Sequence, residues 1–584
     1  MWASAVTTST GVGLATLARA GALPCSTGFI AVGLRLASTS RRLSGLTRQQ
    51  QHGSAWSREL DTEAASKIPP TSSILDQDAI FRALDETKEA AKDIAHVRTI
   101  LERALERATL KKVQGELTSE YVQGLDATEA ATLLNIDSSD KTMMSELFKT
   151  ALDIKERIYG NRIVLFAPLY LANYCVNSCT YCAFRSANKH IKRSNLTDEE
   201  IQHEVETLEK MGHRRLLLLT GEDPKYTFDD FLRVVSVVSG VRSEPCGAIR
   251  RINVEIPALS ISDFRRLKAT GEIGTYTLFQ ETYHRETFAK VHPSGPKSDF
   301  DYRLQTMDRA QVAGIDDVGI GALFGLYDYR FEVLAMLQHA NHLEVNYGAG
   351  PHTVSIPRIR PADHAPEAIS PPMPVSDADF LKLVAVLRCA VPYTGMILST
   401  RESPQMRRKL LHLGISQMSA GSKTDVGAYA KGDQKAEMET FGTSPHLDLL
   451  ENLDDHADVN AKPQGPGQGA DLTGQFSLLD HRTLDEIVKD LLEMGFVPSW
   501  CTACYRVGRT GASFMAIAKK GDIHNYCHPN ALLTLREYVE DYASKDTRKL
   551  AESVIDAEKA TLTRTSALER KLHKVMEGER DLYF

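Results

Sequence analysis

The sequence predicts an α/β fold built on a (β/α)8 barrel, the TIM-barrel architecture, from three observations. Eight short apolar runs of strand-like character follow one another between residues 161 and 430. Longer amphipathic segments separate them, and polar or cysteine-rich stretches follow several of them. Eight alternations over roughly 260 residues fit a closed parallel barrel, whose functional groups lie at the C-terminal ends of its strands. The eight runs are IVLFAPLYL, RLLLLTGE, RINVEI, TYTLFQE, DVGIGALFG, TVSIPR, GMILST and ISQMSAGS.

The segment between the first two strands supports the barrel. Thr197 and Glu200 predict a capping box at a helix start. An apolar stripe at helical spacing follows, made of Ile201, Val205, Leu208 and Met211. A doubly wound open sheet would give a similar alternation, but no glycine-rich dinucleotide fingerprint opens this helix. The closed barrel is therefore the better prediction.

The amino-acid composition limits the kinds of partner that we expect. The 584 residues, 42% of them hydrophobic, suffice for a large core and for more than one domain, or for one barrel with additions. A formal charge of −7 offers no basic field for nucleic acid. No uninterrupted apolar run reaches the roughly 20 residues that span a bilayer. We therefore expect neither nucleic acid nor a membrane as partner.

Five segments differ in composition. Residues 1–58 contain no Asp or Glu but several Arg and many Ser and Thr, which predicts a transit peptide for the chloroplast, with a mitochondrion or hydrogenosome as the alternative. Residues 59–160 predict a helical N-terminal extension, and residues 161–430 the barrel. Residues 431–474 are polar, acidic and rich in Gly and Pro, which predicts a disordered insertion. Residues 475–584 predict a C-terminal helical domain that ends in one long charged helix over about 544–576.

Cysteine usage indicates metal binding. Six of the nine cysteines fall into two tight motifs, which argues for metal ligation in a reducing compartment, while Cys25, Cys246 and Cys389 are interpreted as bystanders. The first motif places Cys175, Cys179 and Cys182 directly after the first strand. Structural zinc sites and electron-transfer clusters normally use four protein ligands, so three thiolates leave one metal position open. A zinc knuckle completed elsewhere, or three structural cysteines, is the alternative.

The second motif has the same ligand count. Cys501, Cys504 and Cys527 form a Cys-x2-Cys-x22-Cys pattern near the C-terminus. A zinc ribbon completed by His524 or His528 is the serious alternative. Two three-cysteine motifs in one chain instead suggest two iron–sulfur clusters, each with one iron open to an exogenous ligand. A noncatalytic iron–sulfur scaffold or electron carrier also stays open, although open ligation argues against it.

The first motif, with Tyr181 before its third cysteine, resembles the cluster loop of the radical S-adenosylmethionine (SAM) superfamily. The resemblance implies a 4Fe-4S cluster whose open iron is chelated by SAM. Gly221 and Glu222 at the end of the second strand resemble the motif that binds the SAM amino group. Further SAM-binding candidates, each also compatible with a plain core hydrogen bond, are Asn253, Glu255, Glu281 and Arg303, the last as a partner of the SAM carboxylate.

Longer phrases, running from about residue 74 to 584 with an interruption after Tyr429, closely resemble the HydG family of tyrosine lyases that mature iron-iron hydrogenase. They are GEDP, GAIRRINV, FQETYHR, HPSGPK, MDRA, GIDDVGIG, GPHTVSIPRIRPA, STRESP, SAGSKT and QFSLLDHRTLDE. The alternative is the thiazole-forming relative ThiH, a tyrosine lyase that supplies dehydroglycine for thiamine synthesis. ThiH shares the barrel motifs but lacks the C-terminal cysteine motif.

The resemblance implies a radical reaction on L-tyrosine. A 5′-deoxyadenosyl radical takes a hydrogen atom, and the Cα–Cβ bond breaks to give p-cresol and dehydroglycine (2-iminoacetate). The latter then yields carbon monoxide and cyanide on an additional iron at the auxiliary 4Fe-4S cluster. The implied partners are a low-potential electron donor such as ferredoxin and other hydrogenase maturation proteins. A closed barrel keeps a radical from water, and its lumen can serve as a tunnel between the clusters.

Three residues near the sixth strand complete the expected sites. His352 stands at the start of this strand, so it should face the barrel bottom and bind the additional iron, with His342 as the alternative. Ser355 and Arg358 lie further along the same strand, and Arg360 follows. We expect Ser355 and Arg358 to bind the amino and carboxylate groups of tyrosine, because a guanidinium matches a carboxylate.

Overall fold

The computed structural model describes residues 65–109, 121–431, 474–521, 523–562 and 565–584, and the backbone of a small hairpin, β1 (Lys112–Val113) and β2 (Glu116–Leu117). The expected transit peptide and residues 432–473 of the expected insertion lie outside these residues. The domain boundaries stay a prediction.

Eight parallel strands form a closed barrel, which confirms the predicted fold. The first strand, β3, pairs with the last, β10, through Val164–Phe166 and Gln417–Ser419. Each expected apolar run contributes one strand. The strands are β3 (Arg162–Ala172), β4 (Arg215–Thr220), β5 (Arg251–Glu255), β6 (Ile273–Thr277), β7 (Asp317–Gly321), β8 (Thr353–Ser355), β9 (Gly395–Leu398) and β10 (Gln417–Ser419).

A ninth strand, β11 (Val497–Ser499), pairs in parallel with the first residues of β3. This strand is not predicted from the sequence, because three residues are too few to show a periodicity. β3 has eleven residues, and its first part extends past the residues that pair with β4, so it offers a free edge to β11. This pairing brings Cys501 to the end of the barrel where the strands begin.

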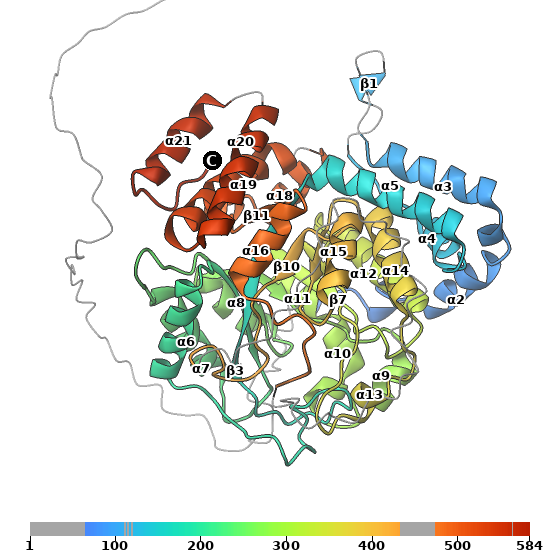
Figure 1. Ribbon diagram of the computed structural model, residues 1–584. Helices are drawn as coiled ribbons and strands as arrows, with labels where there is room; N and C mark the ends of the chain where they lie inside the picture. The colour runs from blue at the N-terminus through green and yellow to red at the C-terminus, as the bar shows by residue number, and fades with distance from the viewer. Residues whose placement is uncertain are drawn as a thin grey trace, which may run out of the picture.

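Helices surround the barrel (Figure 1). The capping box of Thr197 and Glu200 starts the first of them, whose buried face contains Ile201, Val205 and Leu208. The surrounding elements are α6 (Asp198–Lys210), α7 (Phe228–Gly240), α8 (Ile261–Ala269), α9 (Arg285–Val291), η3 (Pro296–Ser298), α10 (Phe300–Leu304), α11 (Thr306–Val312), α12 (Tyr329–Tyr347), α13 (Pro366–Ile369), α14 (Asp377–Ala390), α15 (Pro404–Leu413) and α16 (Leu484–Glu493).

The N-terminal segment is helical, as expected, and lies against α12 and α14 on one side of the barrel (Figure 1). Its apolar faces share one core with the barrel, which includes Ile100, Leu134 and Phe148. The segment comprises η1 (Thr71–Ser73), α2 (Gln77–Glu86), η2 (Ala90–Lys92), α3 (Ile94–Arg107), α4 (Ala127–Leu134) and α5 (Lys141–Tyr159).

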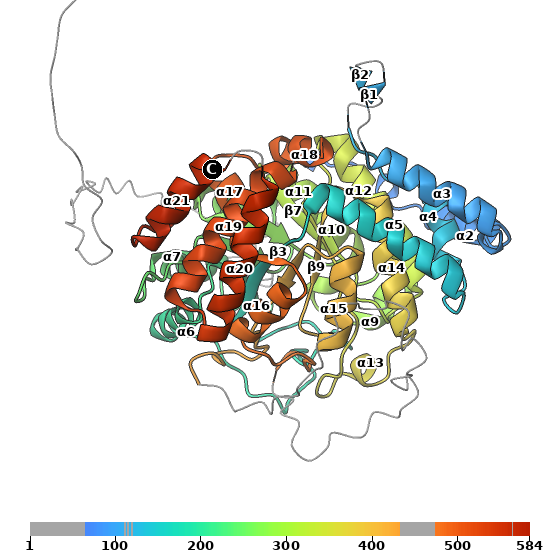
Figure 2. The same cartoon turned by 45° about the horizontal axis from the view of Figure 1, so that its top comes forward.

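The C-terminal helices cover the end of the barrel where the strands begin (Figure 2). The single long helix expected over 544–576 is wrong. Two helices form instead, since Leu562 is extended and ends the first, and both bury an apolar side against the same central helix. The elements are α17 (Ala503–Arg506), α18 (Gly511–Lys519), the central α19 (Ile523–Asp541), α20 (Lys545–Thr561) and α21 (Ser566–Met576).

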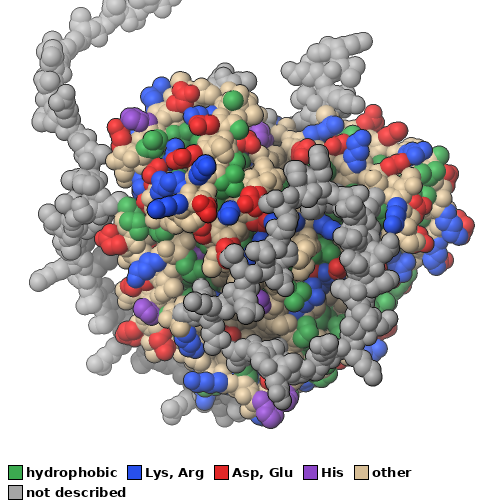
Figure 3. All heavy atoms as spheres, viewed as in Figure 1, with side chains coloured by type: hydrophobic (Ala, Val, Ile, Leu, Met, Phe, Trp, Pro, Cys, Tyr) green, Lys and Arg blue, Asp and Glu red, His purple; other side chains and the backbone are tan. Residues whose placement is uncertain are grey.

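On the face of the molecule drawn in Figure 3, neither basic nor acidic side chains predominate among the described residues, and the two kinds are interspersed. No helix among the described residues is long and apolar enough to cross a membrane.

Candidate active site

Two cavities lie at opposite ends of the barrel. On β3, Arg162 lines the cavity at the start of the strands, and Tyr170 lines the one at their C-terminal ends. β5 repeats this pattern with Arg251 and Glu255. We call these the lower and the upper cavity. Alternate residues of a barrel strand face inward, so the same strands position side chains in both cavities.

The upper cavity collects the first cysteine motif. Cys175, Cys179 and Cys182 all line it from the loop that follows β3. Backbone hydrogen bonds hold this loop, since Ser178 N donates to Ser294 O at 3.2 Å and Thr180 N donates to Val291 O at 3.0 Å. The three thiols are therefore presented by a fixed backbone at the C-terminal end of the barrel.

Of the seven residues expected at the cluster loop and the SAM site, six also line the upper cavity. They are Tyr181, Gly221, Glu222, Glu255, Glu281 and Arg303. Glycine is required at 221 because a Cβ there would collide with the Tyr174 carbonyl. The seventh, Asn253, does not line the cavity. Its Oδ1 accepts from Thr275 N and Arg251 Nε, both at 3.1 Å.

The carboxylates of the upper cavity have opposite pKa shifts. Burial alone would raise the pKa of Glu281, but Lys297 at 2.7 Å and Arg303 at 3.5 Å hold that pKa below its ordinary value. For Glu255, burial and then the charge of Glu281 raise the pKa to about 7. Glu281 therefore stays an anion, whereas Glu255 can exchange a proton near neutral pH. Glu281 also has a φ of +73°, which is unusual for a non-glycine residue.

The lower cavity collects the second cysteine motif. Cys501, Cys504 and Cys527 line it together with His352, Arg162, Arg215 and Arg251. Burial lowers the pKa of His352 to about 4, so the imidazole is neutral, as a metal ligand must be. The His352 Nδ1 lies 3.6 Å from Asp317 Oδ1, and its ring packs on Phe514 at 4.6 Å between centroids. Packing on Phe514 restrains the ring, whereas Asp317 lies too far from Nδ1 for a hydrogen bond.

The chain is similar to known proteins over most of its length. A Radical SAM superfamily model matches residues 169–340, and a Biotin and Thiamin Synthesis associated domain model matches residues 355–497. A solved structure of HydG, a maturase of the [FeFe]-hydrogenase, is 44% identical and covers 88% of this chain and 100% of its own, with a TM-score of 0.75. The 2-iminoacetate synthase of Escherichia coli is 33% identical over 342 residues, which are 58% of this chain and 86% of the relative.

The chain belongs to the HydG and 2-iminoacetate synthase family of radical SAM enzymes.

Within this family the chain is closer to HydG than to the synthase. A second HydG structure, from Carboxydothermus hydrogenoformans, is 35% identical, covers 86% of this chain and 100% of its own, and has a TM-score of 0.65. HydG thus matches the greater part of this chain, whereas the synthase matches 58% of it.

The thiols of this HydG-type chain fit iron–sulfur clusters. Burial raises the pKa of Cys179 to about 12, and the neighbouring Cys175 and Cys182 raise it further against the effect of Lys297. Neighbouring buried thiols such as Cys179 and Cys182 become thiolates together only with a strong positive charge between them. Among the described residues, no three His, Cys, Asp or Glu side chains are grouped closely enough for a single metal ion. Thiols spread around a cavity suit a cluster, in which each thiolate binds a different iron.

The thiols of the lower cavity have a more positive environment than those of the upper cavity. Cys504 and Cys527 share a hydrogen bond, which lowers the pKa of Cys527, while Arg162, Arg509 and Arg215 lower it further against its burial. Burial lowers the pKa of Arg215 itself to about 9, and Arg251 adds to this effect. The arginines thus make the lower cavity favourable for anions before any iron is bound.

The histidines considered as alternative metal ligands do not line the lower cavity. Two of them, His524 and His528, are the candidate ligands of a zinc ribbon. They stack on each other at 4.6 Å, and His528 Nε2 lies 2.9 Å from Glu558 Oε2. His342 is on α12, where its Nε2 is 2.7 Å from Asp308 Oδ1 of α11. The zinc-ribbon ligands and the alternative iron ligand are therefore not brought to the cysteines, whereas His352 is.

The expected role of Arg358 conflicts with its contacts. Its guanidinium binds Glu402 and, at 2.6 Å, Asp377, so its donors are already engaged, and neither Arg358 nor Ser355 lines the upper cavity. Arg360 and Arg401 line it instead. Arg401 is half-buried, lies over the Phe476 ring at 3.4 Å, and forms no ion pair or side-chain hydrogen bond with the described residues. Arg401 is the better candidate for a substrate carboxylate.

Sequence reasoning also missed Gln475. Its Nε2 lies 3.6 Å from Cys182 Sγ, and its Oε1 accepts from the Tyr170 hydroxyl at 2.9 Å. The residue stands directly after the expected insertion, 293 positions from Cys182, and no local pattern marks it. The motif STRESP does contain Arg401, and its position after a barrel strand was the signal available for that residue.

Proposed function

We propose that this chain cleaves L-tyrosine to p-cresol and dehydroglycine in the upper cavity, and that dehydroglycine gives carbon monoxide and cyanide in the lower cavity. The products would serve assembly of the iron-iron hydrogenase active site. The observation that carries the proposal is the presence of two three-cysteine sites, each with one open ligand position, at opposite ends of one barrel.

In the upper cavity, the residues of the chain bind and orient the substrates. A bound cluster would supply the electron that cleaves SAM to methionine and a 5′-deoxyadenosyl radical. Glu222 and Arg303 offer partners for the amino and carboxylate groups of SAM. Arg401, with Arg360 beside it, offers a partner for the carboxylate of tyrosine. Glu255, with its pKa near 7, can accept a proton from the tyrosine amino or phenol group.

A route between the cavities would run through the barrel interior. Leu217, Asn253 and Ile397 lie midway along three strands, on the same inward rows as cavity-lining residues. Each is only partly buried although it lies inside the barrel, so the lumen is not filled at this level. Dehydroglycine is small and carries a carboxylate, which the arginines of the lower cavity would attract.

The lower cavity would hold the second cluster and an additional iron. Cys501, Cys504 and Cys527 supply three thiolates, and His352 supplies a neutral imidazole for the additional iron. Arg162, Arg215 and Arg251 stabilise anions there, which include a carboxylate and cyanide. Asp317 places a carboxylate 3.6 Å from His352 Nδ1.

The deciding experiment is a reaction of the anaerobically reconstituted protein with tyrosine, SAM and dithionite. We expect p-cresol, cyanide and carbon monoxide together. p-Cresol without the two diatomic products would favour the ThiH-type alternative, and no p-cresol from a cluster-loaded preparation would remove the lyase assignment. Iron analysis adds an independent measure, with about eight or nine irons and no zinc expected, against about four irons for the alternative.

We also propose that residues 1–58 direct the chain to the plastid, on the basis of their composition. A fluorescent reporter fused after residue 58 should accumulate in plastids of a photosynthetic host. Accumulation in mitochondria or hydrogenosomes would contradict the choice of organelle, and a cytosolic signal would contradict a transit peptide.

A further inference from the structure

The last four residues of the chain contact the loop that carries two of the lower cysteines. We call residues 581–584 the tail and residues 501–509 the cysteine loop. Arg506 donates to the Asp581 carboxylate, and Arg509 Nη2 donates to the Phe584 carbonyl at 2.9 Å. Arg509 N in turn donates to the Cys504 carbonyl at 2.8 Å. The tail therefore holds the cysteine loop from its outer side.

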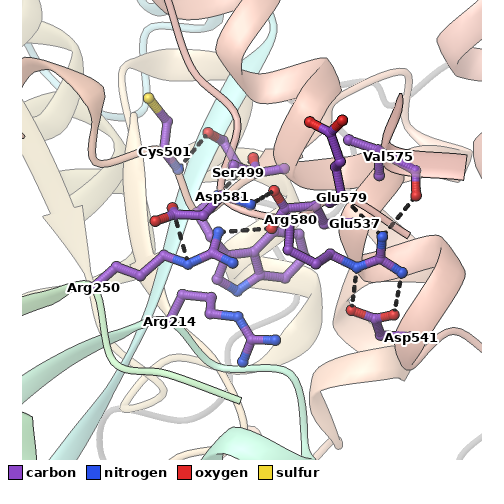
Figure 4. A network of polar contacts seen from close by, with 12 residues as sticks. Arg214, Arg250, Ser499, Cys501, Glu537, Asp541, Val575, Glu579, Arg580 and Asp581 are labelled. Atoms are coloured by element: carbon purple, nitrogen blue, oxygen red, sulfur yellow. Dashed lines mark hydrogen bonds and ion pairs between the residues drawn. The ribbon is translucent and has the colours of Figure 1, made fainter. Parts of the chain in front are cut away.

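Asp581 also joins the tail to the barrel, as Figure 4 shows. Its carboxylate lies 3.2 Å from Nε of Arg250, the residue before β5. The Arg250 Nη1 lies 2.6 Å from Glu537 on α19, and Asp581 N donates to the same Glu537 at 2.6 Å. The side chains of Arg250 and Glu537 are only 6% and 5% exposed. Asp581 thus joins the barrel and the cysteine loop through its carboxylate, and α19 through its backbone N–H.

The backbone of the tail is fixed on both sides of this bridge. Before it, Arg580 forms a two-point contact with Asp541 at 2.6 and 2.8 Å. After it, Phe584 N donates to Asn530 Oδ1 at 2.8 Å, and Asn530 stands three residues after Cys527 on α19. Asp581 itself has a φ of +65°, a conformation that side-chain-bearing residues rarely adopt unless their contacts require it.

We propose that Asp581 and the tail form a clasp that holds Cys501 and Cys504 in register with Cys527, so that the lower site can bind its cluster. Asp581 is a positioning residue, because it acts on the cysteines through Arg506 and Arg250. No contact of the tail reaches the upper cavity among the described residues. The clasp therefore serves only the lower site. Where product ratios test this selectivity, the test rests on the proposed function.

The test compares Asp581→Asn with Glu579→Gln. Both remove one negative charge without changing size, but Glu579 pairs with Lys574 at 3.0 Å and, among the described residues, forms no hydrogen bond or ion pair with the cysteine loop or the barrel. Asparagine also tolerates a positive φ, so the change isolates the ion pairs. We expect Asp581→Asn to lower the affinity of the lower site for its cluster by about tenfold, as loss of an outer-sphere partner does. Iron content per chain and the auxiliary-cluster spectrum measure this loss.

Two further measurements separate positioning from folding. Hydrogen exchange of residues 501–509 in the cluster-free protein should accelerate in Asp581→Asn while exchange in the barrel strands stays unchanged. The ratio of carbon monoxide to p-cresol should fall, with p-cresol formation preserved. A chain ending at Arg580 should behave as Asp581→Asn or worse, and Glu579→Gln as wild type.

Full iron content and an unchanged product ratio in both Asp581→Asn and the truncated chain would overturn the clasp. A parallel loss of p-cresol, with faster exchange throughout the barrel, would also overturn it, since the tail would then serve general stability. If the wild-type protein makes no p-cresol, the proposed function fails, but the iron content and the exchange of residues 501–509 still decide the clasp.

Discussion

The upper and the lower cavity have the same number of cysteines in different electrostatic surroundings. Among the described residues, three carboxylates and four cationic side chains line the upper cavity, whereas three arginines and no carboxylate line the lower one. Paired charges of both signs suit a site that binds the amino and carboxylate groups of SAM and tyrosine. Arginines without acidic neighbours suit a site that receives a carboxylate and retains cyanide. The three cysteines alone therefore do not distinguish the two sites, but the surrounding charges do.

The largest effect should follow from removing one cysteine at either site. Cys182→Ser should abolish p-cresol, carbon monoxide and cyanide together, because the reaction starts in the upper cavity. Cys504→Ser should abolish the two diatomic products while p-cresol continues. Chromatography for p-cresol, with haemoglobin binding for carbon monoxide, distinguishes the two. Carbon monoxide from a zinc-free Cys504→Ser protein would contradict the division of labour.

A second test sharpens the assignment of the substrate carboxylate. Arg401→Gln should raise the KM for tyrosine by about ten- to a hundredfold, since a hydrogen bond to a charged group contributes about 1.5–3 kcal/mol. Arg358→Gln is the matched control from the same end of the barrel. It should leave the KM of the folded protein near wild type but lower the free energy of unfolding by about 3–5 kcal/mol, because it leaves Glu402 buried beside Arg360 alone. An unchanged KM in Arg401→Gln would count against our assignment.

A third test concerns the additional iron. His352→Ala should lower the affinity for this iron by about tenfold or more, measured by iron analysis and electron paramagnetic resonance. His342→Ala should leave the iron signal intact, because His342 is paired with Asp308 away from the lower cavity. Loss of the signal in His342→Ala but not in His352→Ala would reverse the choice.

The smallest effect is the pH dependence of Glu255. Its pKa is raised from 4.5 to about 7 in the folded protein, so the folded state binds more protons than the unfolded state between these values. The free energy of unfolding of the cluster-free protein should therefore fall as pH rises from about 4.5 to 7, by up to about 3 kcal/mol from this group. Denaturant titrations of wild type and Glu255→Gln at pH 5 and 8 measure the difference. An equal pH dependence in both proteins would contradict the shifted pKa.

The sequence predicted those features that depend on local pattern. Eight apolar runs gave eight strands, and the spacing of the cysteines separated two motifs that the barrel then places at its two ends. The position of His352 at the start of β8 placed it correctly in the lower cavity. These inferences needed only strand order and the direction of parallel strands.

Features that depend on pairing between distant residues were not predictable. Arg358, Arg360 and Arg401 look alike in sequence, and only the adjacency of β8 and β9 makes Glu402 the partner of the first two and leaves Arg401 facing the cavity. Gln475 reaches Cys182 across a long excursion of the chain. The strand β11 has too few residues for a periodicity, and its position depends on the free edge of β3.

The length of β3 has a consequence for both sites. Arg162 and Tyr170 are about 26 Å apart along this extended strand, and each lines a different cavity. β3 therefore sets both the distance between the two sites and which of its side chains face the barrel interior at each of them. Deleting one residue between Arg162 and Tyr170 would shift the strand by half a period, so one of the two ends would turn its side chains outward. The two chemistries of the barrel are thus tied to a common register.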